Sequence, residues 1–142
     1  MPSFSLTVDI ARSTEDVFAY LTHVSRVPEW QSSAGSAEVD GEVRKGARIR
    51  ERRTFMGHGV NVELEVTGYD PPRRFDLRSR GGPVSYEVHH VLEPSGGGTR
   101  LDVEVGIKLS GMMRLAAQGP LKLAEREFRA DFGRLKDLLE RG

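Results

Sequence analysis

The sequence contains no cysteine, no long apolar run and no excess of one charge. Without cysteine the chain can form no disulfide, thiolate nucleophile or cysteine-ligated metal site, and this composition is typical of a protein of the reducing cytoplasm. Its 21 basic residues are balanced by 21 acidic residues, so no strong attraction to nucleic acid or to an anionic membrane is expected. No segment approaches the ~20 consecutive apolar residues of a membrane-spanning helix, which predicts no integral membrane association.

The chain also lacks the marks of a targeting segment and of several domains. Residues 1–6 carry no basic segment followed by an apolar run, so no signal peptide is predicted and we expect a cytoplasmic protein. A length of 142 residues suits one domain with its own core, and no linker or internal repeat divides the sequence. We therefore predict a single domain over residues 1–142. The sequence leaves its oligomeric state open.

What the sequence does contain is a long amphipathic pattern from Pro120 to Glu140. Apolar side chains recur there at steps of three and four residues, which places on one helix face Leu121, Ala124, Phe128, Phe132, Leu135 and Leu139. Pro120 suits the first helical turn, where its missing N–H costs nothing. Such a helix is about 30 Å long, enough to cross a sheet. Because a single helix over one curved sheet does not fill the space beneath it evenly, we expect a cavity there.

The first part of the chain predicts one strand and two short helices. Residues 4–10 alternate apolar and polar side chains, as a half-buried strand does. Ser13 or Thr14 can then cap a helix. The apolar face of that helix carries Val17, Phe18, Leu21 and Val24. Residues 25–30 are expected to form the second helix, which ends at the only tryptophan, Trp30.

Between residues 36 and 110 the sequence predicts a meander of antiparallel strands. Strong turn signals separate the strands: Asp40-Gly41, Lys45-Gly46, Gly57-His58-Gly59, Asp70-Pro71-Pro72, Gly81-Gly82-Pro83 and Ser95-Gly96-Gly97-Gly98. The segments between these turns alternate apolar and polar residues, which is typical of strands with one buried face.

Charge pairing predicts the register of one hairpin in this meander. If residues 57–58 form a tight turn, Arg52 lies opposite Glu63 and Arg50 lies opposite Glu65 on one side of the sheet. Opposite charges across a strand pair stabilise it by a few tenths to ~1 kcal/mol. A slip of one residue would exchange the two faces. In this register the apolar face carries Ile49, Glu51, Arg53 and Phe55.

Several polar residues fall on the predicted apolar face of the sheet: Glu51, Arg53, Ser79, Tyr86 and His90. A polar group that faces a dry core without a partner costs about 1–3 kcal/mol or more, so these groups pair with one another, line a wet pocket or lie beyond the core. Glu51 and Arg53, two apart on one strand, can form a salt bridge at the rim. Tyr86 can be a core tyrosine whose hydroxyl reaches the backbone, and His90 is interpreted as lining a pocket.

The sequence predicts no metal site and no cofactor. His89 and His90 are neighbours on a strand, so their rings point to opposite faces and cannot share a metal ion. The glycines at 96–98 precede a strand rather than a helix, which indicates a hairpin turn and not a phosphate-binding loop. The arginines between residues 44 and 80 are interleaved with acidic residues, so we interpret them as a solvated outer face and predict no nucleic-acid groove.

The order of these elements, together with four segments, resembles a known superfamily. The segments are residues 8–18, Pro28-Glu29-Trp30, residues 97–101 and residues 135–140. They resemble the START-like helix-grip superfamily, which includes polyketide cyclase/dehydrase and lipid-transport-like proteins. The resemblance implies a hydrophobic pocket between the sheet and the long helix. It implies no shared catalytic motif, and members bind, transport, cyclise or act as cochaperones, so the fold by itself does not assign the function.

We therefore predict an α+β helix-grip fold, in which a curved antiparallel sheet of about seven strands wraps around a long C-terminal helix and two short helices follow the first strand. The predicted function is to bind a small hydrophobic molecule, lipid- or polyketide-like, in the cavity between sheet and helix. The residues expected to line this cavity are Glu51, Arg53, Phe55, Leu64, Leu77, Ser79, Tyr86, Val88, His90, Val103, Val105, Met113, Leu121, Ala124 and Phe128.

Two alternatives remain open at this point. A polyketide-type cyclase or dehydratase would use His90 as general base and Tyr86 or Arg53 to polarise a carbonyl, so the sequence does not decide whether the protein is an enzyme. A protein-interaction module of the cochaperone kind would have a collapsed cavity beside an exposed apolar patch. The sequence also does not specify the ligand, or whether Glu51 and Arg53 face the cavity or its rim.

Overall fold

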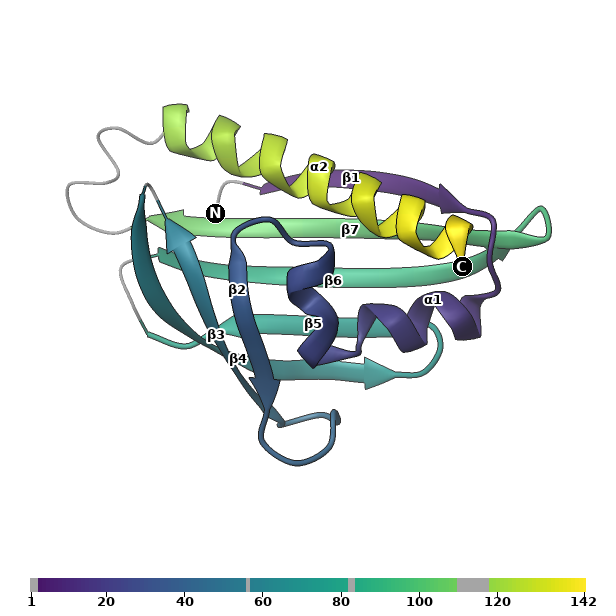
Figure 1. The fold of residues 1–142 in the computed structure, drawn as a ribbon, viewed down its shortest axis with the longest axis horizontal. Helices are drawn as coiled ribbons and strands as arrows, with labels where there is room; N and C mark the ends of the chain where they lie inside the picture. The colour runs from purple at the N-terminus through teal and green to yellow at the C-terminus, as the bar shows by residue number, and fades with distance from the viewer. Residues whose placement is uncertain (1–2, 56, 82–83, 110–117) are drawn as a thin grey trace.

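One antiparallel sheet organises the part of the chain that the computed structural model describes, which is residues 3–55, 57–81, 84–109 and 118–142 (Figure 1). The seven strands are β1 (Ser3–Ile10), β2 (Ala34–Val39), β3 (Arg48–Phe55), β4 (His58–Asp70), β5 (Arg74–Ser79), β6 (Val84–Ser95) and β7 (Gly98–Leu109). Their order in the sheet is β1-β7-β6-β5-β4-β3-β2. The helical elements are α1 (Thr14–Leu21), η1 (Val24–Glu29) and α2 (Gln118–Arg141). This confirms the predicted α+β helix-grip fold.

The two short helices connect one edge strand of the sheet, β1, to the other, β2. Ser13 caps α1, because its Oγ accepts a hydrogen bond of 3.1 Å from the backbone N–H of Asp16. The second element, η1, is a 3-10 helix that begins at Val24, one residue before the predicted start. Trp30 follows directly and is buried, with its ring centroid 5.0 Å from that of Phe132 on α2.

The register of the β3–β4 hairpin differs by two residues from the predicted register. Arg50 pairs with Glu63, not with Glu65, and Phe55 pairs with His58. The turn of this hairpin therefore includes Gly57, whose φ of +81° is a conformation that tight hairpins require and that glycine adopts without strain. The predicted pairings of Arg52 with Glu63 and of Arg50 with Glu65 are wrong.

Because the error in register is an even number, the two faces of the hairpin are as expected. On the outer face Arg48 Nη1 lies 3.0 Å from Glu63 Oε1, and Arg52 donates to Asn61 at 2.9 Å. Glu51 lies on the concave face and is buried.

The sheet is strongly curved, and β4 bends most visibly. The pairing of β4 with β5 shifts between Val66 and Gly68, which marks a β-bulge, and bulges increase strand bending. Gly68 has no space for a side chain, since a Cβ there would collide with the carboxylate of Asp76 on β5. The curvature turns β2, β3 and β4 away from the plane of β6 and β7, as Figure 1 shows.

The helix α2 covers only part of the concave face. It lies over β1 and β7 (Figure 1), and its inward residues Phe132, Leu135 and Leu139 are buried. The spacing on this helix predicts that Phe128 and Phe132 are buried against Val103, Val105 and Leu64. Phe132 is buried, but Phe128 is only half-buried and packs edge-to-face on Phe4 of β1, at 5.6 Å between ring centroids. The reason is that α2 follows the β1 edge at this point. Space therefore remains beneath the curve of β3, β4 and β5. No helix among the described residues is long and apolar enough to cross a membrane.

Candidate functional site

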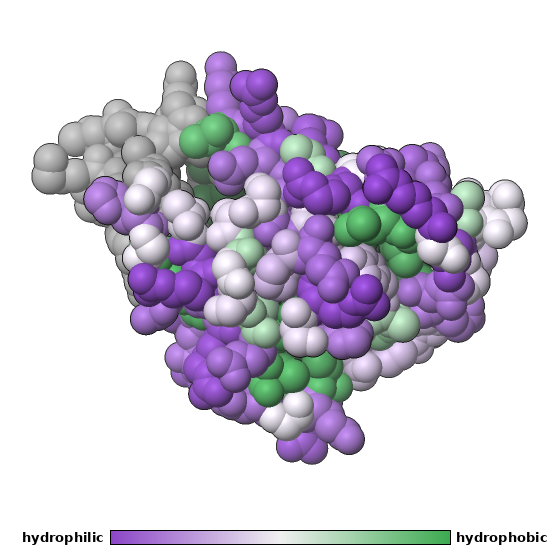
Figure 2. Space-filling model, viewed as in Figure 1, coloured by the Kyte–Doolittle hydropathy of each residue, from purple (hydrophilic) through white to green (hydrophobic). Residues whose placement is uncertain are grey.

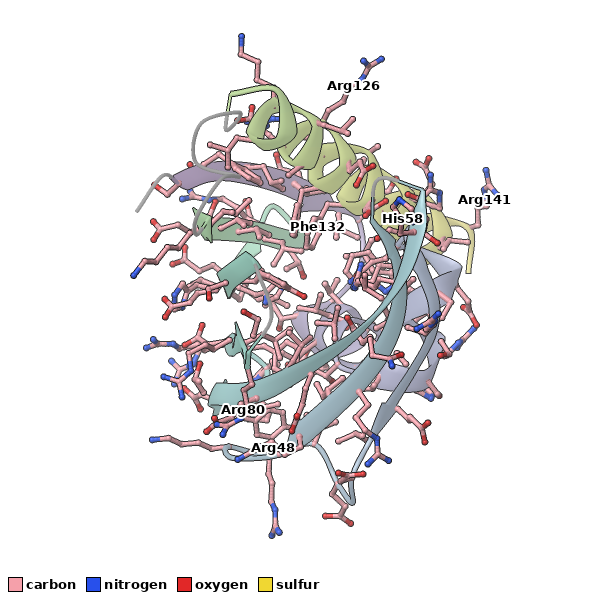
Figure 3. The ribbon with its side chains drawn as sticks, turned by 90° about the vertical axis from the view of Figure 1, so that its left-hand side faces the viewer. Arg48, His58, Arg80, Arg126, Phe132 and Arg141 are labelled. Carbon is pink, nitrogen blue, oxygen red and sulfur yellow. The ribbon has the colours of Figure 1, made fainter. Side chains whose placement is uncertain are left out.

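A partly enclosed pocket of about 290 Å³ occupies the space between α2, η1 and the concave face of the sheet. Its walls are mainly apolar and include Val24 and Val27 of η1, Leu64 of β4 and Phe75 of β5. Phe132 reaches from α2 toward the sheet, whereas Arg126 and Arg141 on the same helix point outward (Figure 3). A pocket with apolar walls and a few polar groups is typical of small-molecule sites, although this volume is at the lower end of their range of ~300–1,000 Å³.

The residues predicted to line the cavity fall into three groups. Those that line the pocket are Glu51, Arg53, Leu64, Leu77, Ser79, Tyr86, Val88, His90, Ala124 and Phe128. Val103, Val105 and Leu121 are not among the lining residues: the two valines lie in the closed core beneath α2, and Leu121 is half-buried on that helix. The Phe55 side chain and Met113 lie outside the described residues.

The centre of the polar part of the pocket is a salt bridge between Arg53 and Glu51. Arg53 Nε donates to Glu51 Oε1 at 2.6 Å, and the two side chains are only 19% and 4% exposed. Arg53 also donates to the Ser33 hydroxyl at 2.8 Å and to the Gln31 side-chain oxygen. Burial is the largest single influence and opposes the charge on Arg53, but electrostatic interactions with Glu51, Tyr86 and Asp131 and the hydrogen bond to Glu51 together raise the pKa of the guanidinium. The pair is therefore a buried ion pair and not a rim contact.

His90 is a neutral hydrogen-bond acceptor toward the pocket. Its Nδ1 lies 2.7 Å from the carbonyl oxygen of Phe75, and because a carbonyl only accepts, Nδ1 carries the proton and Nε2 keeps its lone pair. Burial lowers the pKa of His90 to about 4, although the Phe75 carbonyl and the nearby Asp76 both favour the protonated form. The neighbouring His89 faces the opposite side of the sheet, where Nδ1 lies 3.2 Å from Asp76 Oδ1.

Three further uncharged groups belong to this region. Burial raises the pKa of Tyr86 to about 12, so its hydroxyl stays protonated, and that hydroxyl makes no hydrogen bond to the described residues. The Ser79 hydroxyl accepts from the Tyr86 backbone N–H at 2.8 Å. The Trp30 indole N–H is buried and also has no partner in the described part of the chain. An unpaired donor in a buried site is costly, so a ligand acceptor that pairs with the Tyr86 hydroxyl would be stabilised.

The sequence reasoning missed several residues that line the pocket. Asp131 lies on the inward side of α2, and its Oδ1 lies 3.3 Å from Arg134 and accepts from the Ser32 hydroxyl at 3.2 Å. Its position three residues after Phe128 puts it on the apolar stripe of the helix, so the search for polar residues on apolar faces would have found it. Gln31 and Ser33 lie in a loop without periodicity, which carries no such signal.

Stability should depend on pH through His90. The ordinary pKa of 6.5 in the unfolded chain falls to about 4 in the folded protein, so the unfolded state binds the extra proton between these values. The contribution of neutral His90 to the free energy of unfolding is then fully present above pH ~6.5. This contribution, about 3 kcal/mol, is lost as the pH falls through ~4. Urea unfolding at pH 7 and pH 4 should show a larger loss for the wild type than for His90→Phe by about this amount. Parallel losses in the two proteins would contradict a buried neutral His90.

No group of three or more histidine or acidic side chains in the described residues is arranged to hold a metal ion. The site therefore offers hydrogen bonds, one buried ion pair and apolar walls. A curved seven-stranded sheet that grips one long helix over such a pocket defines the START-like helix-grip class of proteins.

The chain belongs to the family described as polyketide cyclase / dehydrase and lipid transport, whose model matches residues 1–140. Family and fold together indicate a ligand-binding or cyclase/dehydrase-like role. An uncharacterized protein of Mycobacterium tuberculosis is 27% identical over 128 residues, which cover 86% of this chain and 90% of that protein.

Solved structures share the fold at low sequence identity. A Thermus thermophilus protein superimposes with a TM-score of 0.84 at 21% identity, covering 97% of both chains. A START superfamily protein from Mycobacterium smegmatis gives 0.78 at 15% identity and covers 96% of this chain and 98% of that one. The di-domain ARO/CYC StfQ from the steffimycin biosynthetic pathway gives 0.79 at 12% identity, with 98% of this chain matching 51% of that chain. At these identities the likeness concerns the fold alone.

Proposed function

We propose that this protein binds a small, mostly apolar molecule in the pocket between α2 and the sheet. The observation that carries the proposal is the coexistence of apolar walls with a buried polar group, the Arg53–Glu51 pair, which a purely structural core would not need. Buried ion pairs are often no more stabilising than well-packed apolar residues, so such a pair is better explained by recognition of a ligand. Family membership supports the same role.

The second candidate is a cyclase or dehydratase in which His90 is the general base. Two observations favour it. The Nε2 lone pair of His90 accepts no hydrogen bond from the described residues, and the Tyr86 hydroxyl, four residues earlier on the same face of β6, is a protonated donor for a carbonyl. The strength of the base argues against it. A general base works best when its pKa is near the operating pH, and a pKa of about 4 leaves His90 a weak base at neutral pH. We therefore place binding first.

A protein-interaction role has less support. It would call for a filled interior and a contiguous apolar surface. Among the described residues, only Val91 and Leu123 are large, exposed apolar side chains. The face that carries α2 and η1 is mostly hydrophilic with small separate hydrophobic patches (Figure 2).

Binding can be tested with the neutral fluorescent two-ring probe 2-naphthol, whose size suits a pocket of about 290 Å³. We expect saturable binding at one site in the wild type. Ala124 lines the pocket, so Ala124→Phe should fill part of it and weaken binding by about tenfold or more, which corresponds to ~1.4 kcal/mol.

Ala130→Phe is the matched control, because Ala130 lies on the same helix but is exposed to solvent. This variant should bind the probe as the wild type does. Non-saturable binding in the wild type, or equal affinities of the two variants, would refute a binding site in this pocket.

A further inference from the structure

The guanidinium groups and the buried carboxylates of the pocket are already paired within the protein. Glu51 holds Arg53 at 2.6 Å, and Arg134 lies 3.3 Å from Asp131. At the rim, Arg80 lies 2.8 Å from Glu65. A ligand carboxylate would therefore find no guanidinium without a partner among the described residues that line the pocket. An ion that enters a buried site without a counter-ion loses its hydration without a compensating interaction, so its binding is unfavourable.

The balance of charge in the lining favours neither an anion nor a cation. The described lining residues include two guanidinium groups, Arg53 and Arg80. They also include four carboxylates, but Glu63 pairs with Arg48 on the outer face and Glu127 is exposed, so the buried carboxylates are Glu51 and Asp131. His90 adds no positive charge at neutral pH, since burial keeps its pKa low. Neither a carboxylate nor an ammonium ligand would therefore find a surplus of the opposite charge in the buried part of the pocket.

Among the described residues that line the pocket, two uncharged groups have hydrogen-bonding capacity left. The His90 Nε2 lone pair can accept a hydrogen bond, and the Tyr86 hydroxyl can donate one. Neutral donors and acceptors match a hydroxyl or a carbonyl group of a ligand. They do not compensate a full charge of either sign. The free hydrogen-bonding groups and the paired ions thus point to the same chemistry.

We propose that the pocket selects an uncharged ligand, a mostly apolar ring compound that carries a hydroxyl or carbonyl group, and discriminates against carboxylates and amines of the same size. This inference rests on the proposed function, because it specifies which ligands that site accepts. The volume limits the size: a cavity of ~150 Å³ accommodates one benzene ring, so the pocket of about 290 Å³ suits a two-ring compound.

Three naphthalene derivatives of similar size test the proposal by isothermal titration at pH 7. They are 1-naphthol, which is neutral, 1-naphthoate, which is anionic, and 1-naphthylmethylammonium, which is cationic. We expect 1-naphthol to bind at least about tenfold more tightly than either ion. If 1-naphthoate or the ammonium compound binds as tightly as 1-naphthol, the inference is overturned while the proposed function stands. If none of the three binds, the proposed function itself fails and the inference fails with it.

The variant Glu51→Gln tests the cause of the selectivity. It keeps an oxygen that accepts from Arg53 Nε but removes the negative charge, which leaves Arg53 available to a ligand anion. We expect the preference for 1-naphthol over 1-naphthoate to fall by about tenfold or more in this variant.

Glu38→Gln is the control for this substitution. It makes the same change in net charge on β2, at a residue outside the pocket lining. Glu38 is 73% exposed, and its contact with Arg50 is long, at 3.9 Å. This control should keep the wild-type preference. An unchanged preference in folded Glu51→Gln would refute the role of charge pairing. If circular dichroism shows that Glu51→Gln does not fold, the three-ligand comparison on the wild type decides the proposal.

Discussion

Replacing Phe132 with alanine is expected to lower the free energy of unfolding by about 3–5 kcal/mol, because a fully buried phenylalanine loses both its transfer free energy and its packing. Phe132 is only 2% exposed, and its ring lies 5.0 Å from that of Trp30 and 5.8 Å from that of His90. These contacts join α2 to η1 and to the sheet across the pocket. The measurement is urea unfolding followed by circular dichroism, with the slope m checked for two-state behaviour.

Phe128→Ala is the matched control on the same helix. Phe128 is half-buried and contacts Phe4 at the β1 edge, so its removal should cost less, on the order of 1–2 kcal/mol. Equal losses in the two variants, or a loss below about 1 kcal/mol for Phe132→Ala, would show that α2 does not pack in this way.

The second large effect is expected from Arg53→Met, with a loss of about 3–5 kcal/mol in the free energy of unfolding. Methionine retains most of the apolar volume but removes the guanidinium, which leaves the Glu51 carboxylate buried at 4% exposure without its counter-ion. Breaking one side of a buried ion pair is costly for this reason, whereas the intact pair contributes little net stability. Chemical unfolding at pH 7 measures the loss.

Two controls separate the buried pair from a general effect of losing an arginine. Arg50→Met changes the neighbouring residue on the outer face, where the side chain is 58% exposed and pairs with Asp40 at 2.9 Å. Exposed pairs contribute only ~0–1 kcal/mol, so this variant should be nearly as stable as the wild type.

The double variant Glu51→Leu/Arg53→Met removes both charges and should recover much of the stability lost in Arg53→Met. If Arg53→Met is as stable as Arg50→Met and only ligand binding is weakened, the pair is solvated in the absence of ligand. No recovery in the double variant would assign the loss to packing and not to charge.

Sequence periodicity alone determined the elements and their buried faces. The three- and four-residue spacing of apolar side chains predicted the long C-terminal helix, which begins two residues before Pro120 and ends one residue after Glu140. Strand alternation placed Glu51, Arg53, Tyr86 and His90 on one face, and all four line the pocket. The predicted register of the β3–β4 hairpin was wrong, but the predicted faces were right. Side chains in a strand alternate with a period of two, so a shift by an even number of residues preserves the faces.

Only the tertiary structure decided which of these polar groups are paired and which are free to meet a ligand. Arg53 is held by Ser33 and Gln31 from a loop that has no periodic pattern. The Phe75 carbonyl on the neighbouring strand fixes the tautomer of His90, and burial lowers the pKa of its ring. Such contacts join residues that are far apart in the sequence, and they depend on how the sheet curves and where α2 lies on it. Local sequence patterns predict the face on which a side chain lies, but they do not predict which residues it contacts on that face.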